Sequence, residues 1–235
     1  MSSLDPAIPG RSHRVFRGAA LTFAFVLACQ AMWILTAEFY RPELPVFPAD
    51  AKAADVATTQ RSAATAAASV GVVRGDLWAE CALTYLGLLW NDNQDRVSPQ
   101  TPETMQRARE VADRALRFSP HDARIWLILA GLDSRFDWLN GKAAAALRMS
   151  YYTGANETEL IGLRLPLAVR SDALSNKDFQ QLVGHDIRVI VTRKPGLKPV
   201  ILAAYRDALP TGQQFIEQTL TEIDPTQLER LRPQQ

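Results

Sequence analysis

The chain has 235 residues, of which 47% are hydrophobic and 22% are charged. A chain of this length and composition can bury a sizeable core in one or two domains. Its 26 Lys and Arg residues nearly balance its 25 Asp and Glu residues, which leaves a net charge of +1. Because there is no basic excess and no basic run interleaved with aromatic residues, we expect no binding to nucleic acid.

The N-terminal region has the pattern of a membrane-spanning helix. No charged residue occurs between Gly18 and Ala37, and at about 1.5 Å per residue such a helix covers the roughly 30 Å of a bilayer's hydrocarbon core. Basic residues precede this segment and mixed charges follow it: Arg11, Arg14 and Arg17 before, Glu38, Arg41 and Glu43 after. The positive-inside rule then predicts a single-pass protein of the plasma (inner) membrane, with residues 1–17 in the cytoplasm and the rest of the chain in the periplasm or extracytoplasmic space.

Three other interpretations of residues 18–37 stay open. A cleaved signal peptide would have a shorter apolar region and an Ala-x-Ala-like site, which Leu35–Ala37 matches poorly. The run Val26–Cys29 resembles a lipoprotein signal lipidated at Cys29, although the apolar residues continue beyond it. A buried helix of a soluble protein is the third, and the length of the uncharged run argues against it. We expect a retained anchor.

Residues 38–70 are predicted to connect this anchor to a folded domain. Pro42, Pro45 and Pro48 favour an extended, stiff spacer. Residues 51–69 are mostly Ala, Ser and Thr, with almost no large apolar side chain. Such a composition suits a flexible tether or a weakly packed helix, of which we expect the helix, and the folded domain would begin near Val70.

Residues 71–235 are predicted to form an all-α domain. Apolar residues recur at helical spacing throughout, and Pro, Gly and Asn mark the turns. A strand over Val189–Val191 would have no partner, so a helix is expected there too. The expected helices are 76–89 with Asp76 as its cap, 102–118, 123–139, 142–152, 157–170 with a kink or break at Pro166, 178–191, 197–209 and about 215–223, the last preceded by a break at Pro210.

Residues 76–155 resemble two tetratricopeptide repeats, which are helix-turn-helix units of about 34 residues. The matches are Trp78, Ala82, Tyr85, Ala108, Ala112, Ala115 and Pro120 in the first unit, and Trp126, Ala130, Gly141, Ala143, Leu147 and Gly154 in the second. Two positions depart from the pattern, since Asp133 replaces an aromatic residue and Gly154 a terminal Pro. The resemblance implies a helical-repeat α-solenoid and no particular activity, because each matched position serves packing.

The layout of the whole chain is similar to that of single-pass bacterial membrane proteins associated with extracellular polysaccharide biosynthesis. The shared features are an N-terminal span, an Ala-rich linker, the stretch Arg74–Trp78, degenerate repeats and a helical C-terminal end. This resemblance implies a scaffold in the cell envelope whose partner is a protein of a polymerising or exporting machine.

No residue pattern predicts catalysis, a metal site or a cofactor. His13, His121 and His185 have no Cys or second His at metal-ligand spacing. His185 and Asp186 are adjacent on a predicted helix, so their side chains point about 100° apart and do not suit a catalytic triad. Phosphate-binding and dinucleotide-binding glycine motifs are missing, whereas a pair of carboxylates in a cleft would not be visible in a sequence. We expect a protein that is not an enzyme.

Candidate partner-binding residues lie near residue 138, where Trp138 is the best candidate for an exposed contact. An alternative function is that of a glycan-binding envelope module. Aromatic rings would then stack on sugars while polar side chains bond to them. The same six residues are the candidates for partner binding and for this alternative: Trp138, Tyr151 and Tyr152 for stacking, and Asp133, Arg135 and Asp137 for hydrogen bonding.

Overall fold

The fold of the protein was obtained as a computed structural model, which describes residues 10–43, 47, 51–90, 102–137 and 141–226. All regular structure in these ranges is helical, and no strand occurs among them. The prediction of an all-α chain is confirmed. Val189–Val191 lie within a helix.

The elements follow one another along the chain as separate short helices after one long one. They are α1 (Gly10–Phe39), α2 (Ala51–Thr59), α3 (Arg61–Val70), α4 (Gly75–Leu83), α5 (Gly87–Trp90), α6 (Pro102–Phe118), α7 (Ala123–Asp137), α8 (Gly141–Thr153), α9 (Ile161–Val169), α10 (Lys177–Thr192), α11 (Lys198–Asp207) and α12 (Pro210–Ile223). Three short 3-10 turns, η1 (Thr158–Leu160), η2 (Asp172–Ser175) and η3 (Pro195–Leu197), precede α9, α10 and α11.

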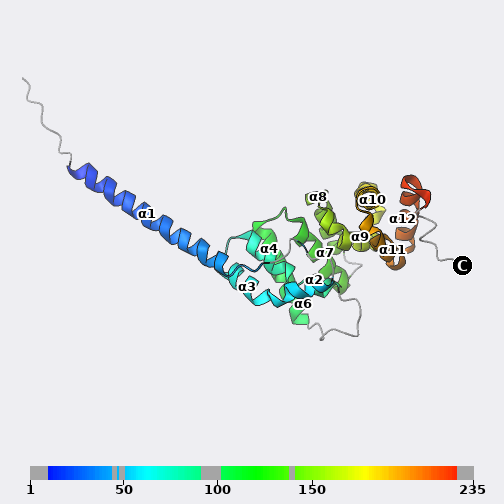
Figure 1. The fold of residues 1–235 in the computed structure, drawn as a ribbon, viewed down its shortest axis with the longest axis horizontal. Coiled ribbons are helices and arrows are strands. Elements are labelled where there is room, and N and C mark those ends of the chain that lie inside the picture. The colour runs from blue at the N-terminus through cyan, green and yellow to red at the C-terminus, as the bar shows by residue number, and fades with distance from the viewer. Residues whose placement is uncertain (1–9, 44–46, 48–50, 91–101, 138–140, 227–235) are drawn as a thin grey trace, which may run out of the picture.

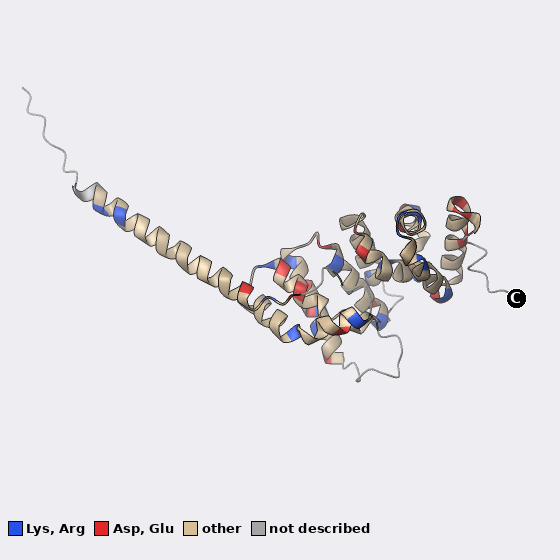
Figure 2. Cartoon of the chain, viewed as in Figure 1, with Lys and Arg blue, Asp and Glu red and all other residues tan. Residues whose placement is uncertain are grey.

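Helix α1 projects from the compact remainder of the molecule, the body, as a long rod (Figure 1). Within the described residues it is the one helix long and apolar enough to cross a membrane, over His13–Phe39. Charged residues lie at its two ends and none between them (Figure 2). The helix is longer than the uncharged segment 18–37, so its ends extend beyond the expected span.

The Ala-rich helices α2 and α3 are packed parts of the body. One face of each is buried, and α3 packs against both α1 and α4. The fully buried residues of this pair are Ala54, Ala57, Ala64, Ala67 and Ala68. Methyl-only faces let helix backbones approach closely, so a segment without large apolar residues can still pack. The body therefore begins at α2 and not near Val70; Pro45 and Pro48 of the expected spacer lie outside the described residues.

Helices α4 to α8 form two successive pairs. α4 packs against α6 and α7 against α8, while α7 also contacts α4 and α6. The expected helix 76–89 is divided, because backbone bonds from Thr84, Tyr85 and Leu86 reach three residues back and tighten the chain into a turn before α5. Asp76 is not the cap, since α4 already begins at Gly75.

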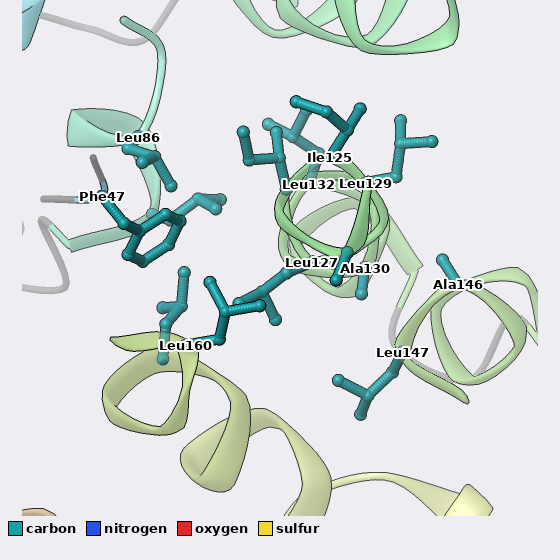
Figure 3. Packing of buried hydrophobic residues seen from close by; sticks show 14 of the residues in the cluster. Phe47, Leu86, Ile125, Leu127, Leu129, Ala130, Leu132, Ala146, Leu147 and Leu160 are labelled. Atoms are coloured by element: carbon teal, nitrogen blue, oxygen red, sulfur yellow. The ribbon is translucent and has the colours of Figure 1, made fainter. Parts of the chain in front are cut away.

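Helix α7 lies at the centre of the body. It is apolar on nearly all sides, as expected for a helix surrounded by others. Figure 3 shows its side chains facing Phe47 and Leu86 on one side, Leu160 on a second and Leu147 of α8 on a third. The fully buried residues of α7 include Ala123, Ile125, Leu127, Ile128 and Leu132.

The C-terminal helices are joined by a buried ion pair. Arg164 of α9 donates from Nε and Nη2 to the two carboxylate oxygens of Asp186 on α10, at 3.1 and 3.0 Å, and from Nη1 to the carbonyl oxygen of Gly154 at 2.9 Å. Its side chain is fully buried. Pro166 lies inside α9 without ending it, and Pro210 begins α12, where a missing N–H costs no helical bond.

Candidate functional site

A groove of about 480 Å³ opens between α7, α8, α9 and the junction of α11 with α12. Its floor is mainly apolar and its rim carries polar and charged side chains. The lining residues are Leu89, Ala130, Gly131, Ser134, Arg135, Ala143, Leu147, Leu163, Pro166, Leu167, Arg170, Ser171, Asp207 and Leu209. The groove is thus built by helices distant in sequence.

Small residues on facing helices make the hollow. Ala130 and Gly131 on α7 and Ala143 on α8 leave space that larger side chains would fill. At Gly131 an added Cβ would lie only 2.7 Å from Cδ1 of Leu89, so a larger residue there would displace the Leu89 side chain, which itself lines the groove. Leucines from α5, α8 and α9 supply the remaining apolar surface.

The rim of the groove has a positive excess. Arg135, Arg170 and Asp207 line it and are exposed. Arg135 donates from Nη2 to the carbonyl oxygen of Leu89 at 3.1 Å, which orients its guanidinium along the wall. An apolar floor beside two guanidinium groups suits a segment that combines apolar side chains with a carboxylate.

The structure places the predicted partner-binding residues in different environments. Of the six, Arg135 lines the groove, and Tyr152 on α8 has 59% of its surface exposed. Tyr151 is buried: its ring meets that of Phe179 edge-on at 5.1 Å, so it offers no face for stacking. Trp138 lies outside the described residues, as does the side chain of Asp137.

Asp133 is buried and joins α7 to α6. It accepts hydrogen bonds from the guanidinium of Arg109 on α6. Burial raises the pKa of Asp133 even though the positive charge of Arg109 opposes that change. Asp133 is one of the two positions at which the sequence departs from the repeat pattern, and in the fold it forms an ion pair between α6 and α7.

Arg164 and most of the groove residues were not predicted from the sequence. A signal for Arg164 was available, because it is the one charge within the apolar run Ile161–Val169. Its partner Asp186 lies on the apolar face of α10 that includes Phe179 and Val183. The groove has no comparable signal, since its residues come from separate helices and look like ordinary core positions.

Among the described residues, no group of three or more His, Cys, Asp or Glu side chains could hold a metal ion. No protein-family model, no curated protein and no solved structure matches the chain. Function is therefore inferred from the groove and from the way in which the body joins α1.

The body is bonded directly to the end of α1 by a network that we call the joint: Glu38, Arg41, Arg74, Asp76 and Glu80. Arg74 pairs with Glu38 at 2.6 Å and with Asp76 at 2.5 Å, and Arg41 pairs with Glu80. Partial burial raises the pKa of Asp76, but hydrogen bonding to Arg74 and its positive charge outweigh this and hold that pKa below its ordinary value.

Proposed function

We propose that this protein is a membrane-anchored scaffold whose groove binds a segment of a protein partner in the cell envelope. The observation that carries the proposal is the open groove with an apolar floor and a basic rim. Arg135 and Arg170 would pair with a carboxylate of the partner, while Leu147 and Leu167 would contact its apolar side chains.

The placement of the groove supports this role. The α9 and α11 walls lie on the side of the body away from α1 (Figure 1). The joint holds the body close to the end of α1, with Ala37 only 1% exposed. A partner bound in the groove would be held at a defined position above the membrane surface.

The proposed orientation follows from the charges that flank the span. Arg14 and Arg17 at the start of α1 would lie in the cytoplasm, and the body would lie in the periplasm or extracytoplasmic space. The membrane would be the plasma (inner) membrane. We also propose that α4 with α6, and α7 with α8, are tetratricopeptide-like units. The contacts within each pair, and those between α6 and α7, support this, and stacked units commonly form a peptide-binding groove.

The resemblance of the layout to polysaccharide-associated membrane proteins suggests the class of partner. We propose a protein of a polysaccharide-synthesising or exporting machine. Glycan binding by the body itself is less well supported, because only Tyr152, of the described aromatic residues considered for stacking, is exposed.

Site-specific photo-crosslinking in native membranes tests the groove. A photoreactive amino acid is placed at Ser134 or at Asp207, which line the groove, and at Arg188, an exposed residue of α10 outside the groove, as the matched control. We expect one discrete crosslinked product from both rim positions and none from Arg188. In the Ser134-labelled protein, Arg170→Glu should reduce that product about tenfold, as expected for a charged contact in an interface, and Arg188→Glu should not.

Two outcomes would contradict the proposal. Crosslinks of equal yield from Arg188 and from the rim would show contact without a preference for the groove. Retention of polysaccharide fragments by the purified protein, abolished by Tyr152→Ala and unaffected by Arg170→Glu, would instead support the glycan-binding function.

A further inference from the structure

The turn between α3 and α4, residues 70–73, lies beside α1 at the level of Trp33. Nε1 of Trp33 donates to the carbonyl oxygen of Val70 at 2.7 Å, which fixes the turn against this position of the rod. Trp33 lies five residues before Glu38, so at about 1.5 Å per residue the contact is about 7 Å further along α1 toward its N-terminus. The turn is therefore alongside the uncharged segment and not beyond its end.

The exposed surface of this turn is apolar. Val72 and Val73 have 54% and 58% of their surface exposed. The chain carries no charge from Ser62 to Val73. Charges begin again at Arg74, whose ion pair with Glu38 marks the level at which the body becomes polar. The same boundary between apolar and charged residues thus occurs on α1 and on the adjacent turn.

Three carbonyl oxygens of the turn accept hydrogen bonds from within the protein. The carbonyl oxygen of Val72 accepts a bond from Nε1 of Trp78 at 3.1 Å, that of Gly71 from the N–H of Arg74, and that of Val70 from Trp33. A carbonyl without such a partner would cost several kcal/mol in an apolar environment. The bonds from two indole groups remove this cost for the carbonyls that would otherwise oppose insertion.

The hydroxyl groups next to the turn are bonded in a similar way. Ser69 donates to the carbonyl oxygen of Thr65 at 2.7 Å, and Thr65 donates to that of Arg61 at 2.7 Å. The exposed side of α3 therefore presents few polar groups that require water.

From these observations we infer that the α3–α4 turn is a second lipid contact, in which Val72 and Val73 insert into the bilayer interface beside Trp33. This inference rests on the proposed membrane anchoring of α1. Together, α1 and the turn give the body two points of attachment, which restrict its tilt on the membrane. The two valines would contact the boundary between the acyl chains and the headgroups, because the turn lies beside α1 at that depth in the bilayer.

Depth-dependent fluorescence quenching tests this inference on the full chain. The protein with Cys29→Ala and Cys81→Ala is reconstituted into vesicles of phosphatidylethanolamine and phosphatidylglycerol and labelled with an environment-sensitive fluorophore at Val72→Cys. Phe25→Cys within α1 reports on anchoring, and Tyr152→Cys on α8 is the exposed control. Circular dichroism verifies that each variant retains its helices.

We expect lipids with a nitroxide near the headgroup to quench the label at residue 72 about twofold or more, with a blue-shifted emission, as for an interfacial group. The label at residue 152 should be quenched by aqueous iodide alone. If residue 25 is quenched by lipid nitroxides but residue 72 behaves like residue 152, the second lipid contact is wrong while the anchor stands. If residue 25 is open to iodide and insensitive to lipid nitroxides, the anchor itself is wrong.

Discussion

The joint and the Arg164–Asp186 pair use the same charged groups in opposite surroundings. At the joint, the exposed fraction of the side chains ranges from 16% for Glu80 and 25% for Arg74 to 46% for Asp76. In the C-terminal half, those of Arg164 and Asp186 are 0% and 2% exposed. Water and salt screen the first set, whereas the second is held in a medium of low dielectric constant.

The difference indicates different roles for the two regions. Exposed ion pairs contribute little to folding, but several of them can orient two elements that are already adjacent. A buried pair cannot lose one partner without leaving a charge in the core, so it makes the packing of α9 on α10 conditional on both residues. The joint therefore sets the direction of the body relative to α1, and the buried pair preserves one wall of the groove.

The largest expected effect is that of breaking the buried pair. Arg164→Leu should lower the free energy of unfolding by about 3–5 kcal/mol, because Asp186 would be left buried and unpaired. Chemical denaturation of the detergent-solubilised protein, followed by circular dichroism, measures this change. The control Arg188→Leu, at an exposed position of α10, should stay within about 0.5 kcal/mol of the wild type.

The double variant Arg164→Leu/Asp186→Leu should recover part of this loss, because no uncompensated charge remains. Equal effects of Arg164→Leu and Arg188→Leu would refute the distinction between the two regions.

An intermediate loss of stability is expected when a closely packed glycine is replaced by alanine. At Gly212 an added Cβ would overlap the backbone carbonyl of Val169, whereas at Gly71, beside the joint, it would meet mainly the Cδ1 methyl group of Leu77, which can turn away. Gly212→Ala should therefore cost about 1–3 kcal/mol and Gly71→Ala less. Thermal unfolding of the two variants measures the order.

Gly162→Ala is the matched control for this pair. It lies in α9 with no atom near the added Cβ, so the higher helix propensity of Ala should raise stability by up to about 1 kcal/mol. A larger loss at Gly71 than at Gly212 would contradict the expectation that the Leu77 side chain yields more easily than the backbone of Val169.

The smallest expected effect on folding is that of Arg74→Ala at the joint. Stability should fall by no more than about 1 kcal/mol, while a label at Tyr152→Cys in vesicles should show faster rotation of the body. The pKa of Asp76 is lower in the fold than its ordinary value of 3.8, so its contribution is present above that pH and is lost as the pH falls below it. Fluorescence anisotropy should therefore converge for variant and wild type in acid and in high salt.

In acid or in high salt, the body of the wild type should become as mobile as that of Arg74→Ala. This result would support the role of the ion pairs in restraining the body. Identical anisotropy of the two proteins at neutral pH and low salt would mean that the ion pairs do not restrain the body.

The helices could be predicted from sequence with good fidelity, because apolar periodicity and turn residues act locally. The long uncharged segment predicted α1, and Ser119–Pro120 correctly marked the end of α6. Gly141 was predicted as a break before the next helix and is instead the first residue of α8. The break after Leu83 was missed, since Tyr85 and Leu86 continue the helical apolar pattern although the chain turns there. The packing of α2 and α3 was underestimated because their buried alanines carry little hydrophobic area.

The residues of the candidate site were harder to predict from the sequence than the helices, because they are brought together only by the tertiary structure. Arg135 was selected from the sequence as a polar contact and lies on the groove rim, whereas Tyr151 belongs to the core between α8 and α10. Periodicity alone does not distinguish an aromatic residue that faces a groove from one that faces another helix.

By itself, the sequence determined that this chain is helical, where most helices end, and that one of them can cross a membrane. These properties depend on side chains within a few turns of one another. The tertiary structure decided that Arg164 meets Asp186, that small residues on α7 and α8 leave an open groove beside α9, and that Trp33 bonds to the α3–α4 turn. Each of these contacts joins residues far apart in the chain, and their energies depend on burial that only the complete packing creates.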